Sequence, residues 1–194
     1  MLAGCIYNKE SGEVLPSGVP PPLISITELF ALYRVNKTKC LYFAPILSDW
    51  MRVFDIATPS RIWAFLATIG VESGKLLYVE EIASGQAYEG RKDLGNIYAG
   101  DGVKYKGRGL IQVTGRKNYT EVSKALGVDF VENPQLLREF PYCVSGSCWW
   151  WWHNGCNQIA DTEEPKAIRK RVNGGLNGYS EFCRYYERAK TIWK

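Results

Sequence analysis

The sequence has no apolar run of about 18 residues, so it predicts no membrane-spanning helix. Histidine is almost absent, because His153 is the single one in the chain. A Ser-His-Asp or Cys-His arrangement would have to use it, and no nucleophile motif accompanies it. Basic residues form no run with interleaved aromatic residues, which argues against nucleic acid as a partner. Carboxylate chemistry is therefore the better hypothesis for an enzyme.

Six cysteines in 194 residues do not make a disulfide scaffold. Cys143, Cys148, His153 and Cys156 form the one cluster that suggests metal ligation. Their C-x4-C-x4-H-x2-C spacing differs from the common zinc patterns, whose first two ligands are two to four residues apart. On a helix, Cys143 and Cys148 would also point about 140° apart. We therefore expect free buried thiols or one disulfide, with no metal and no cofactor.

The composition is that of a globular domain, with 46% hydrophobic and 13% aromatic residues. Residues 1–24 are polar and rich in turn-forming residues, and we expect an irregular N-terminal leader there. A single domain follows over residues 25–194. Helical periodicity predicts helices over 25–33, 41–54, 61–74, 118–126, 134–139, 145–155, 163–175 and 179–193. The glycine-rich segment 85–115 reads as loop and short hairpin, ending in an alternating strand over 110–115. The predicted fold class is α+β and mainly helical.

The segment "RIWAFLATIGVESG" reads as an amphipathic helix that places a glutamate at its end. Pro59 suits the first helical position after Thr58, and Gly74 suits a left-handed C-terminal cap. Glu72 then lies at the edge of the apolar stripe and in the last turn, which suits a proton donor. A solvated surface glutamate is the alternative reading.

A glycosidase needs a second acid, or a substitute for one, near the first. Glu81 follows Glu72 by nine residues, and a chain reversal at Gly74 would let the two carboxylates face each other across a groove. Gln112 and Thr114 project from one face of the predicted strand and could hold a water molecule and a sugar amide. An ordinary edge strand fits the same pattern.

Four blocks of the sequence resemble glycoside hydrolase family 19. They are "FLATIGVESG", "ASGQAYEGRKDLGN", "GDGVKYKGRGLIQVTGRKNY" and "RVNGGLNG", in the family's order, and the resemblance extends from about residue 25 to the end. The sequence is more similar to the family's phage and bacterial branch, the chitinase-like endolysins, than to its plant chitinases. The resemblance implies a lysozyme-like, two-lobed domain with a small irregular β region beside the catalytic cleft. It also implies inverting cleavage of β-1,4 bonds next to N-acetylated sugars.

Carried over by position, the resemblance assigns roles to seven residues. Glu72 matches the general acid, Glu81 the general base, and Thr114 the residue that positions water. The positions that contact sugars are Gln112, Asn118, Asn173 and, as a weaker match, Tyr105. Asn173 also reads as a helix C-cap beside Gly174, and both readings are compatible.

The sequence departs from the family pattern near both acids. Val71 stands where the family usually has a histidine before the acid, and Ile82 replaces the asparagine after the second acid. The usual Gly-Gly-Phe after Glu72 is loosened to "SGKLL". Glu80 therefore remains a rival of Glu81 for the base.

Three functional hypotheses follow. The leading one is an endolysin-type peptidoglycan hydrolase that lyses bacterial cells, with a secreted effector of the same chemistry as a variant. It would be made in the bacterial host cytoplasm and act on the cell wall, or be secreted, and we expect a monomer. A chitinase acting on chitin is the second hypothesis, and a catalytically inactive glycan-binding module is the third.

Overall fold

The computed structural model describes residues 5–7, 14–16 and 20–194 of the chain. Nine α-helices are found there: α1 (Ile26–Tyr33), α2 (Lys37–Val53), α3 (Pro59–Glu72), α4 (Asp101–Lys104), α5 (Arg116–Leu126), α6 (Tyr142–His153), α7 (Cys156–Asp161), α8 (Pro165–Asn173) and α9 (Tyr179–Ile192). Three short 3-10 helices accompany them: η1 (Gln86–Tyr88), η2 (Lys92–Leu94) and η3 (Pro134–Arg138). The fold is mainly helical, as the sequence predicts.

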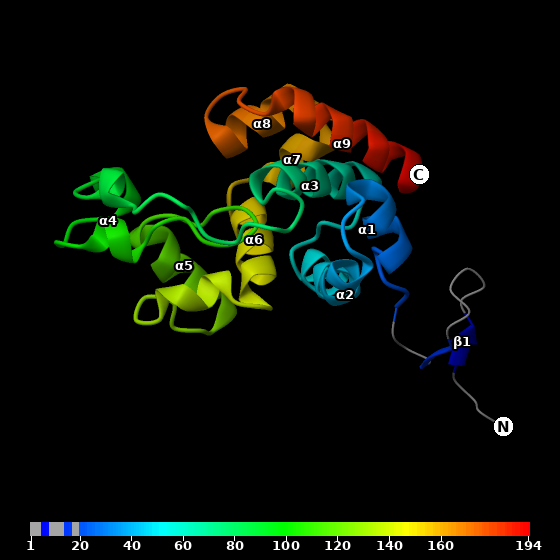
Figure 1. Ribbon diagram of the computed structural model, residues 1–194, viewed down its shortest axis with the longest axis horizontal. Coiled ribbons are helices and arrows are strands. Elements are labelled where there is room, and N and C mark those ends of the chain that lie inside the picture. Colours follow the sequence, from blue (N-terminus) through cyan, green and yellow to red (C-terminus); the bar gives the residue numbers. More distant parts are fainter. Residues whose placement is uncertain (1–4, 8–13, 17–19) are drawn as a thin grey trace.

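Helix α3 is the helix around which the larger lobe is built. It packs against α9, α7 and α8, and Figure 1 shows it between these helices and α1. Its buried residues run without a break from Ala64 to Gly70, so the helix is enclosed on more sides than the predicted single stripe. A Cβ on Gly70 would meet Tyr33 of α1 at 2.8 Å and Tyr185 of α9 at 3.0 Å. Glycine at this position therefore allows three helices to meet.

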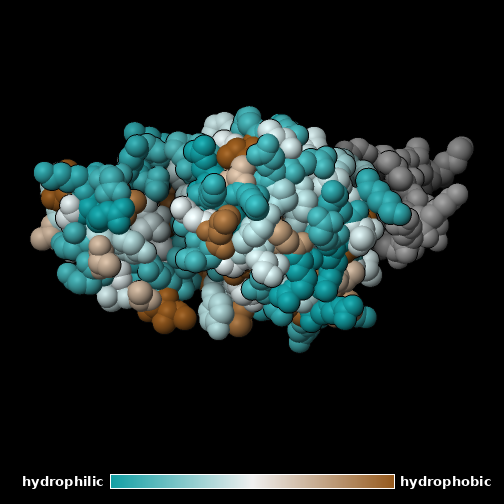
Figure 2. Space-filling view, turned by 90° about the horizontal axis from the view of Figure 1, so that it is seen from above, coloured by the Kyte–Doolittle hydropathy of each residue, from teal (hydrophilic) through white to brown (hydrophobic). Residues whose placement is uncertain are grey.

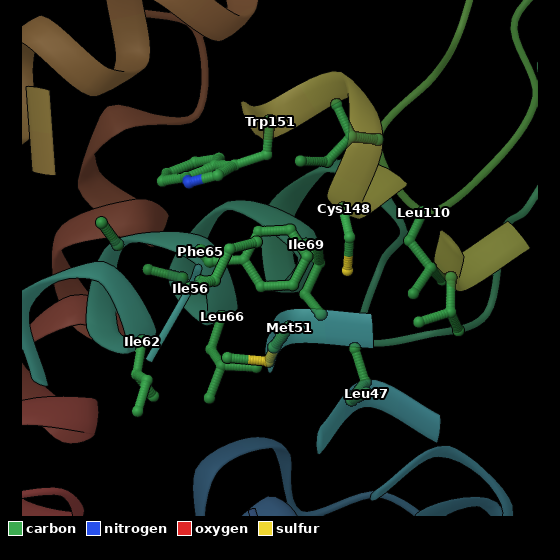
Figure 3. Close-up of a cluster of buried hydrophobic side chains, with 14 of the residues drawn as sticks. Leu47, Met51, Ile56, Ile62, Phe65, Leu66, Ile69, Leu110, Cys148 and Trp151 are labelled. Carbon is green, nitrogen blue, oxygen red and sulfur yellow. The ribbon is translucent and has the colours of Figure 1, made fainter. Parts of the chain in front are cut away.

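The core joins α3 to helices on its other side. Figure 3 shows Phe65 and Ile69 of α3 among Leu47 and Met51 of α2 and Trp151 of α6. The rings of Phe65 and Trp151 meet edge to face, with their centroids 5.4 Å apart. Such aromatic pairs add about 0.5–1.5 kcal/mol beyond the apolar area they bury. This packing fixes the direction of α3 and hence the place where its last residue lies.

A smaller lobe carries α4 and α5 and is connected to the larger one beside α6 (Figure 1). Asp101, at the start of α4, pairs with Arg116 at the start of α5 through two hydrogen bonds of 2.6 and 2.8 Å. The guanidinium of Arg116 also lies over the rings of Tyr98 and Tyr105. A polar and cationic cluster thus holds this lobe together where glycine-rich sequence supplies few apolar side chains.

Two sequence predictions about secondary structure are wrong, and one helix of the structure was not predicted. The strand expected over 110–115 is a turn, closed by one bridge in which Arg108 and Val113 exchange backbone hydrogen bonds. The hairpin expected within 85–115 is replaced by η1, η2 and α4. Helix α7 has no counterpart among the predicted helices. The β region of the domain thus consists of two isolated bridges in the described residues, Glu80–Arg108 and Arg108–Val113.

Helix α2 begins at Lys37, four residues before the predicted start, because Asn36 caps it through Thr38 N at 2.8 Å. The capping box of α1 is present, with Ser25 and Glu28 each bonded to the backbone amide of the other. Two short strands, β1 (Cys5–Tyr7) and β2 (Val14–Pro16), pair antiparallel within the predicted leader. The rest of the leader up to residue 19 lies outside the described residues.

The cysteines whose side chains are described are all free thiols: Cys40, Cys143, Cys148, Cys156 and Cys183. Burial raises the pKa of Cys143 to about 11 and that of Cys156 to about 12, so both stay protonated at neutral pH. Across residues 20–194 no group of His, Cys, Asp and Glu is arranged to hold a metal ion. None of the described helices has the length and apolar character needed to cross a membrane. Figure 2 shows a surface on which hydrophilic residues predominate and hydrophobic ones are scattered.

Candidate active site

Glu72 is the last residue of α3, and a left-handed turn follows it directly. Gly74, Lys75 and Leu76 have φ of 56°, 61° and 64°, so the predicted left-handed cap at Gly74 extends over three residues. Ser73 holds this turn from within: its hydroxyl accepts from Leu76 N at 2.8 Å and donates to Ile69 O. Non-glycine residues in this region are strained, which is characteristic of functional sites. The turn reverses the chain immediately after the first carboxylate.

The carboxylate of Glu72 is paired with a buried arginine. Nη1 of Arg169, on α8, donates to Oε1 of Glu72 at 2.5 Å. The Arg169 side chain is 1% exposed, whereas that of Glu72 is 22% exposed. Glu72 is thus neither a fully solvated surface acid nor a buried one. One of its oxygens is held from the protein side, and part of the side chain reaches solvent.

The carboxylate of Glu81 is held by neutral donors, while Lys106 Nζ donates to the Glu81 backbone carbonyl at 3.1 Å. Its Oε1 accepts from the Tyr88 hydroxyl at 2.9 Å, and its Oε2 accepts from Gly107 N at 3.2 Å. Burial, then the hydrogen bond to Glu81, raises the pKa of Tyr88, which therefore remains a donor. The Glu81 backbone also pairs with Gly107, through Glu81 N to Gly107 O at 2.9 Å. These two donors fix the orientation of the Glu81 carboxylate, since each of its oxygens accepts one hydrogen bond.

Glu80, the rival for the base, lies in a different environment. Arg108 and Arg138 hydrogen-bond its two oxygens at 2.8 and 2.9 Å, and Lys106 Nζ lies 3.6 Å away. Burial alone would raise the pKa of Glu80, but the hydrogen bond from Arg138 and the charge of Arg108 outweigh it and lower the pKa. Glu80 therefore reads as a structural link between three segments, which favours Glu81 for catalysis.

Gln112 and Thr114 lie in the turn over 110–115 and Asn118 in the first turn of α5, and all three are half-buried. Gln112 packs over Gly107, where an added Cβ would lie 2.6 Å from Gln112 Oε1. The Asn118 amide donates to Thr114 O at 2.8 Å. Because Gly107 also bonds Glu81, the turn brings Gln112 near the second acid although the predicted strand is absent.

Tyr105 and Asn173, both predicted to contact sugars, differ in their exposure to solvent. Tyr105 is fully buried, packs against the Tyr119 ring with centroids 5.1 Å apart, and donates to Val131 O. No part of its side chain is accessible to a sugar, so this placement gives it a structural role and corrects the prediction. Asn173 is exposed as the last residue of α8, one turn beyond Arg169. The C-terminal cap of α8 is Gly174 in the left-handed conformation, so the reading of Asn173 as the C-cap is wrong.

Sequence reasoning missed the residues that hold the two acids. Arg169 lies on a helix that reads simply as basic, and nothing in its spacing indicates that it is buried. Ser73 and Tyr88 lie in segments without periodicity, so their partners depend on the tertiary fold. The one available signal was Ser73 beside Gly74, since serine and glycine are common where a helix ends in a turn.

Comparison with known proteins identifies the family. Residues 61–166 match the family model described as chitinase class I, that of glycoside hydrolase family 19. A glycosyl hydrolase family 19 domain-containing protein of Haemophilus influenzae is 37% identical over 106 residues, covering 55% of this chain and 51% of that protein. An endochitinase of Arabidopsis thaliana is 31% identical over 143 residues, 64% of this chain and 47% of that protein. The chain thus spans about half the length of the curated relatives it matches.

Solved structures with a similar fold are chitinases. A class IV chitinase from Zea mays superposes with a TM-score of 0.71 and 18% identity, over 88% of this chain and 92% of that one. Chitinase C from Streptomyces griseus gives 0.67 and 20%, over 95% and 82%. At this identity the likeness concerns the fold.

Proposed function

The chain belongs to glycoside hydrolase family 19, and from its chitinase-like glycosidase architecture we propose that it hydrolyses the β-1,4 glycosidic bonds of bacterial peptidoglycan by inversion. The observation that carries the proposal is the contrast between two carboxylates on either side of the left-handed turn. Glu72 is partly exposed at a helix end with one oxygen held by Arg169, and the carboxylate of Glu81 is oriented by neutral donors. Two acids in different environments suit the two roles of a glycosidase.

In the proposed mechanism Glu72 is the general acid. Its protonated carboxyl donates to the glycosidic oxygen while the bond from that oxygen to the sugar C1 breaks. A water molecule attacks C1 from the opposite face and gives its proton to Glu81, the general base. Thr114 is assigned to position that water, and Gln112 and Asn118 to bind N-acetyl groups. The product sugar then has the inverted anomeric configuration, and exchange with solvent restores both acids.

The charge near Glu81 favours peptidoglycan over chitin. Lys106, Arg108 and Arg138 bring three positive charges around Glu80, and with the Glu81 carboxylate beside them the excess is one. Peptidoglycan carries carboxylates on its peptide stems, whereas chitin is neutral. A cationic border beside the second acid would attract the anionic polymer and have little effect on the neutral one.

The test is to incubate purified peptidoglycan with the wild type, Glu72→Gln and Glu81→Gln, and to identify the new reducing ends by mass spectrometry. We expect soluble fragments from the wild type and a loss of about 10²–10⁴-fold in rate for either variant, the usual contribution of general acid–base catalysis. The reducing-end sugar names the bond that is cut, and proton NMR of the fresh product shows whether its anomer is inverted. Full activity of Glu72→Gln would refute the mechanism.

A chitinase is the second candidate, because the relatives and the solved neighbours are named as chitinases. Incubation of the same three proteins with chitin oligomers, followed by product analysis, decides between the two substrates. Chitin cleavage without release of peptidoglycan fragments would select the chitinase. Binding to either polymer without any product would select the inactive glycan-binding module.

The proposal includes where the enzyme works. As an endolysin it would be made in the bacterial host cytoplasm and act as a monomer on the cell wall, or a secreted effector would reach the same wall. The free thiols are compatible with synthesis in a reducing compartment. Expression in bacteria with and without a pore-forming partner, followed by culture lysis, tests the release route.

A further inference from the structure

Arg169 is a buried cation whose hydrogen bonds go to two functional segments. Nη1 donates to Glu72 Oε1, and Nη2 donates to the carbonyl of Asn177 in the loop between α8 and α9. Its Nε has no hydrogen-bond partner among the described residues. Gly178 brings the same loop to α3: an added Cβ there would lie 2.9 Å from Val71, the residue before Glu72.

Stability alone is a poor reason to bury this guanidinium. Removing a charge from water costs several kcal/mol, and well-packed apolar residues often replace buried ion pairs without loss of stability. Here one donor is left unpaired and the partner carboxylate is still partly exposed, so the pair is not optimised for stability. The arrangement does restrict the Glu72 side chain, because the held oxygen has one fixed direction.

We propose that Arg169 is the positioning residue of the general acid. By holding Oε1 of Glu72 it leaves Oε2 as the oxygen that carries the proton and gives that oxygen a fixed direction. Through Asn177 it couples this orientation to the loop that follows Asn173. The inference rests on the proposed function of Glu72, and Arg169 itself, being buried, does not touch the substrate.

This role makes a kinetic prediction that a purely structural role does not. Misplacing a reacting group by about 1 Å can cost about 10²-fold in rate. We therefore expect Arg169→Met to lower kcat by about 10²-fold on an unactivated oligomer while KM stays within about twofold, since uniform binding is unchanged. Arg169→Lys should recover part of kcat, because one ammonium can reach Glu72 but cannot also bond Asn177 in the same way.

Arg61→Met is the matched control. Arg61 lies near the other end of the same helix and donates two hydrogen bonds to Asp161, at 2.7 and 2.8 Å, and one to the Asp55 carboxylate, at 2.5 Å. Its loss removes two arginine–carboxylate pairs from α3 without touching Glu72. We expect it to lower the melting temperature and to leave kcat within about twofold, as for independent sites.

A second substrate shows whether the loss acts through the acid. A 2,4-dinitrophenyl glycoside of an N-acetylglucosamine oligomer has a leaving group that needs no proton, so Glu72→Gln should lose much less rate on it than on the natural oligomer. Arg169→Met should follow the same pattern, with its rate deficit reduced at least tenfold. Melting temperatures of all variants verify that they are folded.

The outcomes separate the two proposals. No cleavage of any glycan by folded wild type, or full activity of Glu72→Gln, overturns the proposed function and this inference with it. Loss of activity in Glu72→Gln together with an unchanged kcat in Arg169→Met overturns the inference alone. So does a deficit of Arg169→Met that is equal on both substrates, or a rise in KM at constant kcat.

Discussion

Ser73→Ala tests whether the left-handed turn after α3 is held by one hydroxyl group. Ser73 is fully buried, and Leu76, whose amide donates to its hydroxyl at 2.8 Å, is 3% exposed. Alanine would leave that amide without its acceptor, and an unsatisfied buried group costs about 1–3 kcal/mol. Ile69 O would lose one donor but still accepts from the Ser73 amide at 3.0 Å, so it adds little. We expect a loss of about 2 kcal/mol in the free energy of unfolding.

Urea denaturation and calorimetry measure this loss. For a domain of this size about 2 kcal/mol corresponds to a fall of about 4–8 °C in melting temperature. The activity should fall too, because a relaxed turn no longer fixes Glu81 relative to Glu72. Ser145→Ala is the control: Ser145 is equally buried, but its hydroxyl donates to the Tyr142 carbonyl one turn earlier in its own helix, at 3.4 Å.

The reasoning is refuted if Ser73→Ala and Ser145→Ala lose the same free energy of unfolding. It is also refuted if Ser73→Ala retains full kcat at a temperature where it is folded. In the first case the turn is held by packing, and in the second its shape does not position the acids.

Two further predictions concern charged residues of the smaller lobe and the bridge region. The hydrogen bonds from Arg116, then backbone amides, lower the pKa of Asp101, so its stabilisation is complete above the unfolded pKa near 3.8 and is lost as pH falls through the lower folded value. Asp101→Asn should therefore have a lower free energy of unfolding than wild type at pH 7, and the difference between the two proteins should narrow below about pH 4. Unfolding curves measured over this pH range test the prediction, and a difference that stays constant contradicts the pairing. Glu80→Gln should destabilise the fold but keep kcat within about tenfold, because Arg108 and Arg138 hold Glu80 structurally. A fall in kcat equal to that of Glu81→Gln would make Glu80 the base.

The elements that the sequence predicts well are those with local causes. Helix α1 carries its capping box, and α5 ends at Gly127 in the left-handed conformation, as the sequence indicates. The strand over 110–115 fails because alternation also arises in a turn whose buried residues, Ile111 and Val113, anchor it from one side. Periodicity reports burial, and burial does not require a ladder of hydrogen bonds.

The positions of the site follow from sequence only in part. Glu72 could be placed at a helix end, and Gly74 could be expected to reverse the chain, because both signals are local. The contacts of Arg169 and Tyr88 span 97 and 7 residues and depend on how α8 and η1 lie against other segments. The sugar-contact prediction for Tyr105 failed because a tyrosine in a glycine-rich segment suggests an exposed side chain. The fold instead encloses this side chain completely.

The enclosure of α3 has a consequence for the order in which the enzyme becomes functional during synthesis. Helix α3 leaves the ribosome early, but the partner of its terminal glutamate, Arg169, is on α8, and Trp63 donates to the carbonyl of Trp193 beyond α9 at 2.6 Å. Domains fold as units once their parts are available. A nascent or truncated chain that lacks α8 therefore holds the Glu72 carboxylate without its arginine partner. The orientation of this carboxylate is fixed only after α8 has been synthesised and has packed against α3.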